Sequence, residues 1–148
     1  MADIVAPAVR SRMMAGIRSK NTKPEIVLRK GLHAEGFRFR LHDRKVPGTP
    51  DMVFPKWHAV IFVHGCFWHG HGCRLFKWPG TREEFWREKI GRNMANDVRH
   101  QAMLAEAGWR VGIIWECATR SKAGQQQMVK TVADWLRSDQ QRLELEAA

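Results

Sequence analysis

The sequence lacks any apolar run near the roughly 20 residues that span a bilayer, so no transmembrane helix is predicted. Its first residues, MADIVAPAVR, lack the apolar stretch of a secretory signal, and a cytoplasmic location is therefore expected. Only three cysteines occur among 148 residues, which argues against a disulfide framework. Internal repeats and low-complexity linkers are also missing. These absences indicate a single compact domain with no membrane partner.

Acidic residues are scarce relative to basic ones. Fifteen Asp and Glu stand against 25 Lys and Arg, which gives a formal net charge of +10. This excess predicts a nucleic-acid partner, because each phosphate that a basic side chain neutralises releases condensed counterions. The alternative is an ordinary globular protein that happens to be basic. An anionic membrane surface fits less well, since no segment joins a basic face to a wide apolar one.

Sequence patterns divide the chain into three parts and predict an α/β fold. Residues 1–20 are expected to form a basic arm or short helix, 21–138 a single domain, and 139–148 a weakly ordered tail. Helices are predicted at 22–36, at 81–108 and in a last amphipathic segment that carries Met128, Val132, Trp135 and Leu136 on one face. Strands are predicted at 37–41, 51–54, 59–63 and 111–115. The expected architecture is a small mixed sheet flanked by helices.

The cysteine–histidine segment (residues 64–73, HGCFWHGHGC) is the densest group of metal-binding side chains in the chain. Cys66, His71 and Cys73 offer two thiolates and an imidazole, and Cys117 completes the set if the strand before it neighbours 59–63. Three sulfurs and one nitrogen favour zinc in a closed, structural site. Two alternatives remain: His69 binds the metal in place of His71, or the cysteines are buried and unligated.

A catalytic group is predicted at the edge of the sheet from which this segment emerges. The carboxylate of Asp51, with the main-chain carbonyl of Val63, can hold Mg²⁺ against a scissile phosphate. A turn cap explains Asp51 equally well. His69 is not required by the zinc site and suits general-base chemistry, with His64 and Asp97 as orienting partners.

Several aromatic residues lie close to this group. Phe67 and Trp68 are costly to expose unless they plug the core or insert between DNA base steps as wedges. Trp86 and Met14 are further wedge candidates, whereas the tryptophans at 109, 115 and 135 are expected in the core. One predicted helical stripe mixes residue types in a way that suits a nucleic-acid groove, although a solvated helix face is the alternative. The stripe consists of Trp86, Lys89, Asn93 and Asp97.

Five segments of the chain resemble the very-short-patch-repair (Vsr) DNA mismatch endonucleases. They are RSKNTKPE at 18–25, PGTPD at 47–51, FVHGCFWH at 62–69, EFWREKI at 84–90, and GWRV with WEC between 108 and 117. The similarity extends from about Arg10 to the last helix. It implies a restriction-endonuclease-like fold. It also implies nicking of double-stranded DNA on the 5′ side of the thymine in a T:G mismatch that arises by deamination of 5-methylcytosine.

The resemblance also implies a role for each candidate residue. The catalytic set is Asp51 as magnesium ligand, His69 as general base, and Glu25, His64 and Asp97 as supporting groups. The zinc set is Cys66, His71, Cys73 and Cys117. The DNA-binding set is Phe67, Trp68 and Trp86 from the major groove, Met14 from the other groove, and Lys89 and Asn93 near the mismatched pair. For Glu25, a capping box with Thr22 is the competing explanation.

The sequence departs from restriction-type nucleases in one respect. Val63 and Gly65 stand where those enzymes carry a second carboxylate and a lysine, which favours a histidine-assisted mechanism. Two other functions remain open: a zinc-stapled module that binds distorted DNA without cutting it, and hydrolysis at the zinc itself. A monomer is expected, with the mismatch-repair machinery as a possible partner. The flanking sequence context and the number of Mg²⁺ ions are not predicted.

Overall fold

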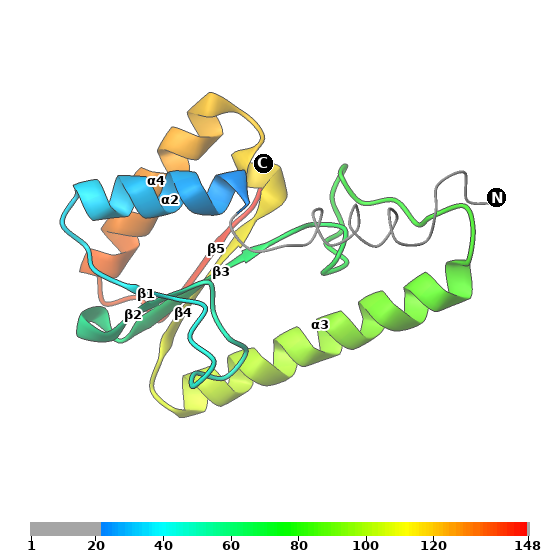
Figure 1. The fold of residues 1–148 in the computed structure, drawn as a ribbon, viewed down its shortest axis with the longest axis horizontal. Coiled ribbons are helices and arrows are strands. Elements are labelled where there is room, and N and C mark those ends of the chain that lie inside the picture. The colour runs from blue at the N-terminus through cyan, green and yellow to red at the C-terminus, as the bar shows by residue number, and fades with distance from the viewer. Residues whose placement is uncertain (1–21, 148) are drawn as a thin grey trace.

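The computed structural model describes residues 22–147 as a five-stranded sheet with three helices (Figure 1). The helices are α2 (Lys23–Ala34), α3 (Glu83–Glu106) and α4 (Lys122–Arg137). The strands are β1 (Arg40–Leu41), β2 (Met52–Phe54), β3 (Ala59–His64), β4 (Arg110–Trp115) and β5 (Arg142–Leu145), with 3-10 turns at Pro55–Trp57 and Glu116–Thr119. None of the helices in this part of the chain could cross a membrane. The predicted basic arm, with Met14, lies outside the described residues.

The sheet is mixed, as the sequence predicts. Its strands lie in the order β1-β2-β3-β4-β5; β1, β2 and β3 pair antiparallel, whereas β3, β4 and β5 pair parallel. The central strands β3 and β4 are almost entirely buried, which matches their continuous apolar sequences. Because β3 and β4 are parallel neighbours, the residues that follow them leave the sheet at the same edge.

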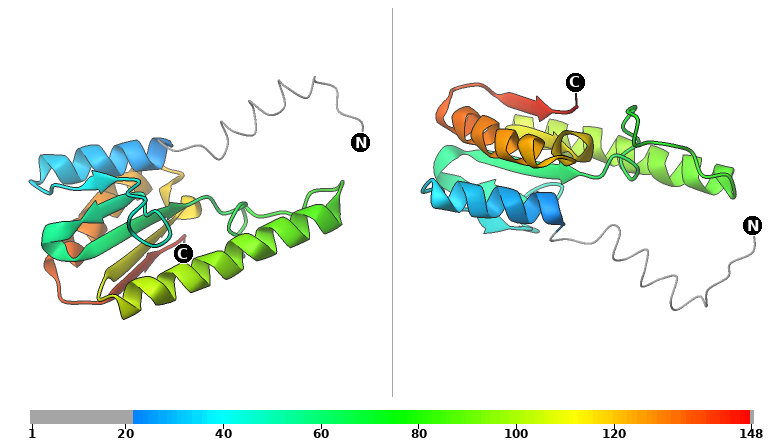
Figure 2. Two further views of the ribbon diagram at one scale, coloured as in Figure 1. Left: turned by 60° about the horizontal axis from the view of Figure 1, so that its bottom comes forward. Right: turned by 90° about the horizontal axis from the view of Figure 1, so that it is seen from above.

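Helices cover both faces of the sheet (Figure 2). Leu28 and Leu32 of α2 and Val132 and Leu136 of α4 are buried in the core on one face. On the other face, Leu104 near the end of α3 packs in a second hydrophobic core with strand residues Val53, Val60, Phe62, Val111 and Ile113. The predicted amphipathic stripe of the last helix is confirmed, since its Met128, Val132, Trp135 and Leu136 are all buried.

The amino-terminal half of α3 extends beyond the sheet and runs alongside the loop that follows β3 (Figures 1 and 2). Gly70 in this loop has φ +62°, and a Cβ added there would lie 2.5 Å from the Met94 Sδ and 2.9 Å from the Ile90 Cγ2. Glycine favours this site because it adopts the left-handed conformation without strain and leaves room for the Met94 and Ile90 side chains. The loop is fixed against α3 at this point.

Two predicted elements are shorter in the structure. The strand predicted at 37–41 contains only Arg40 and Leu41, because the Phe37 N–H still bonds the Leu32 carbonyl at the helix end (3.0 Å) and the Phe37 ring packs on Phe54. The long helix begins at Glu83 instead of Thr81. Its N-cap residue, Arg82, has φ 55°, and no side chain caps the helix.

The carboxyl-terminal segment is more ordered than the sequence predicts. Weak order is expected for 139–148, yet Arg142–Leu145 forms β5 beside β4. In the RLEL sequence, Leu143 and Leu145 alternate with charged residues. Both leucines pack against the core that α2 and α4 form with the sheet. An alternation of only four residues is too short to predict a strand from the sequence. In the fold these residues form one because they pair with the edge of β4.

Candidate active site

The candidate site lies where β2, β3 and β4 meet at one edge of the sheet. His64 and Trp115 are paired at the ends of the parallel strands β3 and β4, which brings Cys117 beside the cysteine–histidine segment. Because β2 runs antiparallel to β3, Asp51 just before β2 reaches the same edge. There the Val63 N–H donates a hydrogen bond of 2.7 Å to the Asp51 Oδ2. The sheet topology thus gathers residues that are far apart in the sequence.

Four potential metal ligands cluster at the end of β3. The Sγ atoms of Cys66, Cys73 and Cys117 and a ring nitrogen of His71 all lie within 4.8 Å of one another. The Cys117 N–H donates to the Cys66 Sγ at 3.3 Å, and the His71 Nδ1 lies 3.7 Å from the Cys117 Sγ. Burial raises the pKa of the Cys66 thiol, a cost that a bound cation would reverse. The donor set fits a tetrahedral Zn²⁺ site with no ligand position left open.

The geometry also distinguishes His71 from His69 as the candidate ligand. The His71 Nδ1 faces the thiols, while its Nε2 lies 2.9 Å from the Glu146 Oε2. A carboxylate on the outer nitrogen is the usual partner of a metal-bound histidine, because it fixes the ring and its tautomer. The His71 ring also stacks on Trp115 with centroids 4.1 Å apart. His69 belongs to a different group.

That second group consists of His64, His69 and Asp97. The two imidazole rings stack with centroids 3.7 Å apart and planes at 5°, and the His69 Nδ1 lies 2.5 Å from the Asp97 Oδ2. Burial, followed by the proximity of His69, lowers the pKa of His64 to about 3, so His64 is neutral at pH 7. A carboxylate at Nδ1 favours the tautomer of His69 whose Nε2 can accept a proton.

The third group surrounds Asp51. Glu25 is only 3% exposed, and its Oε2 accepts a hydrogen bond of 2.8 Å from Arg29. Thr22 occupies the N-cap position of α2, but its side chain makes no cap hydrogen bond, so the Thr22 half of a capping box is not formed. Burial, followed by repulsion from Glu25, raises the pKa of Asp51 to about 7. The carboxylate oxygens of Glu25 and Asp51 lie within 4.8 Å of each other. A divalent cation bound between them would offset both effects.

An open cleft joins the second and third groups. Its walls come from α2, the turn before β2, the end of β3 and one face of α3. Among the predicted site residues it is lined by Glu25, Asp51, Val63, His64, Trp68, His69, Lys89, Asn93 and Asp97. Thr49, His100 and Gln101, which the sequence analysis did not single out, also line it. The predicted catalytic residues therefore share one accessible surface.

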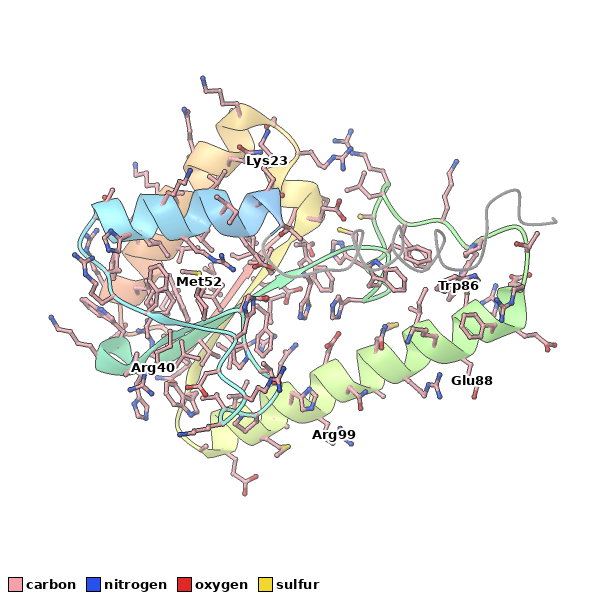
Figure 3. The ribbon with its side chains drawn as sticks, in the orientation of Figure 1. Lys23, Arg40, Met52, Trp86, Glu88 and Arg99 are labelled. Atoms are coloured by element: carbon pink, nitrogen blue, oxygen red, sulfur yellow. The ribbon has the colours of Figure 1, made fainter. Side chains whose placement is uncertain are left out.

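Aromatic side chains form a cluster at one end of the cleft. Phe67, Trp68 and Trp86, termed here the aromatic wedge, have ring centroids 5.1–5.7 Å apart and are half-buried. Figure 3 shows Trp86 on the side of α3 that faces the loop, with Glu88 on the opposite side. The Asn93 Nδ2 donates to the Trp68 carbonyl at 2.9 Å and so fixes the wedge to α3. The stripe of α3 faces this loop and the cleft, and is not a fully solvated face.

Comparison with known proteins identifies the family. A profile of the family described as DNA mismatch endonuclease Vsr matches residues 2–75. The type II nicking enzyme V.XorIIP of Xanthomonas oryzae pv. oryzae is 46% identical over 134 residues, which cover 90% of this chain and 98% of the relative. The DNA mismatch endonuclease Vsr of Escherichia coli is 45% identical over 138 residues, which cover 92% of this chain and 88% of the relative. The chain belongs to the Vsr family.

The predicted resemblance to the Vsr family is thus confirmed, and the chain is a DNA endonuclease. A third relative, the type II nicking enzyme V.NmeAIP of Neisseria meningitidis, is 42% identical over 83% of this chain and 88% of its own length. A nuclease of this family is expected to use a divalent metal, and both the thiol cluster and the carboxylates around Asp51 fit such an ion.

Three residues of this Vsr family member lie at the site although no sequence signal indicated them. Trp115, predicted as core, lies between His71 and the His64–His69 pair and donates from its Nε1 to the Glu144 Oε2 at 2.8 Å. Glu146 belongs to the tail for which the sequence predicts weak order. His42 lies in a polar turn, and only the fold brings it to Asp51. Trp115 belongs to the WEC segment that resembles the family but is expected in the core, whereas His42 and Glu146 lie in none of the resembling segments.

Proposed function

We propose that this endonuclease nicks double-stranded DNA on the 5′ side of the thymine in a T:G mismatch produced by deamination of 5-methylcytosine. The observation that carries the proposal is the shared cleft, in which Asp51 and the His69–Asp97 pair lie beside an aromatic wedge. The family description names a mismatch endonuclease, and the Xanthomonas relative is named a nicking enzyme. The net charge of +10 favours binding to the DNA backbone.

Asp51 is the proposed ligand of a catalytic Mg²⁺. Its carboxylate, the Val63 carbonyl and the nearby Glu25 would hold the ion at the edge of the sheet. When bound, the ion would neutralise charge on the scissile phosphate. The Val63 N–H, hydrogen-bonded to the Asp51 Oδ2, keeps the carboxylate oriented toward the cleft.

His69 is the proposed general base. The carboxylate of Asp97 holds the Nδ1 of the ring, so the Nε2 is available to accept a proton from the attacking water. The neutral ring of His64 stacks against His69 and restricts its rotation. No second carboxylate or lysine is needed for proton transfer in this scheme, in keeping with Val63 and Gly65 at the corresponding positions.

The thiol cluster is the proposed structural zinc site. Cys66, His71 and Cys73 lie on the loop, and Cys117 follows β4, so a bound Zn²⁺ would tie the loop to the sheet. With four protein ligands, the metal would have no free position for a hydrolytic water, which argues against zinc as the catalytic ion. The loop fixed in this way carries both His69 and the aromatic wedge.

The aromatic wedge would enter the DNA at the mismatch from the major groove. Insertion of apolar rings between base steps costs a few kcal/mol of unstacking, and a mispaired step is the least costly to open. Lys89 and Asn93 face the same cleft and are the proposed contacts to the mismatched pair, and Met14 would approach from the other groove. We further propose a restriction-endonuclease-like fold in one domain, acting as a monomer, with mismatch-repair proteins as partners.

A nicking assay tests the function. The full chain, supplied with Zn²⁺ and Mg²⁺, is expected to cut the thymine strand of an end-labelled duplex that contains one T:G pair. The same duplex with T:A is the control and should remain intact. A panel of flanking sequences is required, because groove shape and the deformability of neighbouring steps influence recognition. Binding without cutting in every context, or cutting of T:A duplexes at the same rate, would contradict the proposal.

The Trp68→Ala substitution is predicted to weaken binding to a T:G duplex by about 10–100-fold, because a stacked aromatic contributes about 1–3 kcal/mol per base. Trp78→Ala is the matched control, since Trp78 lies on the same loop but outside the wedge and is 38% exposed. Fluorescence anisotropy of both variants on T:G and T:A duplexes measures the effect. Equal losses in the two variants would indicate general damage to the loop instead of a wedge function.

A further inference from the structure

The proposed mechanism gives no role to His42. This histidine lies beside the two carboxylates of Glu25 and Asp51. Its Nε2 lies 3.5 Å from the Glu25 Oε2 and 3.5 Å from the Asp51 Oδ1. Its side chain is largely buried, with 14% of its surface exposed. The three side chains come from α2, from the turn after β1 and from the start of β2, and only the fold brings them together.

The backbone of His42 is held in an unusual conformation. Its φ of 48° lies in the left-handed region, which costs free energy for a residue with a side chain. The His42 N–H donates to the Asp51 main-chain carbonyl at 3.3 Å, which fixes the turn against the start of β2. Strain of this kind persists only where surrounding contacts impose it, and here it directs an imidazole toward two carboxylates.

The His42 Nε2 lacks a normal hydrogen bond. The atom is buried, and no hydrogen-bond partner reaches it among residues 22–147. Buried ring nitrogens are rarely left in this state, because a polar group that loses water without gaining a partner destabilises the fold. The carboxylate oxygens at 3.5 Å are too far for a strong bond but are nearly equidistant. The nitrogen is therefore placed for a ligand between the three side chains.

The spacing suits a metal ion. The ligand atoms of Glu25, His42 and Asp51 all lie within 4.8 Å of one another. Neighbouring ligands of an octahedral ion with bonds of about 2.1 Å are about 3.0 Å apart, so separations of 3.5 Å close with small side-chain movements. Two carboxylate oxygens and one imidazole nitrogen form a mixed donor set. First-row transition ions accept imidazole nitrogen, and Mn²⁺ is the one among them that also shares the preference of Mg²⁺ for carboxylate oxygen. A site with two carboxylates and one imidazole therefore suits Mn²⁺ better than Mg²⁺.

We infer that His42 is a third side-chain ligand of the catalytic cation site, beside the Val63 carbonyl, and that Glu25, His42 and Asp51 together bind a first-row transition ion such as Mn²⁺ in preference to Mg²⁺. This inference rests on the proposed function of Asp51 as a metal ligand and adds the ion class that the site selects. The enzyme is expected to nick DNA with either ion, and His42 determines how strongly Mn²⁺ competes with Mg²⁺.

Mn²⁺ bound to the full chain tests the inference without reference to activity. The protein is first loaded with one equivalent of Zn²⁺ and freed of excess, so that the thiol cluster is filled and the Glu25, His42 and Asp51 group remains available to the probe. Electron spin-echo spectroscopy should then detect one directly bound imidazole nitrogen on Mn²⁺. In His42→Gln this nitrogen signal should disappear and the Mn²⁺ dissociation constant should rise by about 10-fold, while Mg²⁺ affinity changes little.

His100→Gln is the matched control, because His100 lines the same cleft outside this group. It should keep the nitrogen signal and the Mn²⁺ affinity. A nitrogen signal that survives in His42→Gln would locate the ion elsewhere, for example at His64, His69 and Asp97, and would overturn the inference. So would Mn²⁺ bound by oxygen ligands alone in the unmodified chain. The nicking assay is scored separately, so failure to cut T:G duplexes would refute the proposed function and leave this result standing.

Discussion

Replacement of His69 by glutamine is expected to lower the rate of nicking by a factor of about 10²–10⁴, the usual contribution of a positioned general base. Glutamine has a similar size but cannot accept a proton from water at neutral pH. Asp97 orients the ring of His69 but lies on its far side, at Nδ1, and so cannot replace the lost Nε2. Single-turnover rates on a T:G duplex measure the loss.

DNA binding distinguishes a lost base from a damaged loop. His69→Gln should bind the T:G duplex within a few-fold of the unmodified chain, because the wedge and the thiol cluster remain. His33→Gln is the control, since His33 is exposed at the end of α2 and outside the cleft. Loss of binding in parallel with loss of cutting, or near-normal cutting by His69→Gln, would contradict the assignment of His69 as base.

Removal of zinc is the second large effect expected. If Zn²⁺ binds the folded chain at a concentration 1,000-fold above its dissociation constant, it stabilises the fold by about 4 kcal/mol. A domain of this size changes its Tm by about 2–4 °C per kcal/mol, so a strong chelator should lower the Tm by about 10 °C. The metal would join the loop to the segment after β4 through Cys117. Its removal would release both segments at once. Thermal unfolding followed by circular dichroism provides the measurement.

Cys117→Ser separates a metal effect from a nonspecific effect of the chelator. The variant lacks one of the four ligands and should begin with a lowered Tm that the chelator barely changes further. The free cysteine count should rise by three in the unmodified chain after chelation, as the thiols are released. A chelator that leaves the Tm of the unmodified chain unchanged would refute a structural role for the cluster.

Much of the candidate metal site could be predicted from the sequence because three of its four candidate ligands lie close together in the chain. Cys66, His71 and Cys73 are within eight residues, and Cys117 is expected to join them only if its strand lies next to 59–63, a condition that the parallel pairing of β3 with β4 meets. Two continuous apolar segments predict two buried strands, but they do not determine which strands are neighbours. What the sequence left open, His69 or His71 as the ligand, depends on which way each ring points, and the structure directs only His71 toward the thiols.

The remaining features depend on contacts between segments that are distant in the chain. Glu25 lies three residues after Thr22, a spacing that suggests a role in capping the helix. Its burial beside Asp51 results from the packing of α2 on the sheet, which the sequence does not show. Glu146 reaches His71 only because β5 pairs with β4, and the RLEL sequence is too short to predict that pairing. His42 depends on a strained turn that no motif marks. Tertiary packing decides each of these positions.

Helix α3 gives this endonuclease a fixed distance between recognition and chemistry. Asn93, a proposed contact to the mismatched pair, and Asp97, the partner of His69, are four residues apart on the helix face that lines the cleft, a rise of about 6 Å. Successive phosphates of one strand advance by about 3.4 Å. If the DNA shifted by one nucleotide, the scissile phosphate would move by more than half of the roughly 6 Å that separates Asn93 from Asp97 along the helix. The break should thus fall at a constant offset from the mispaired base, even where the flanking sequence changes how tightly the DNA binds.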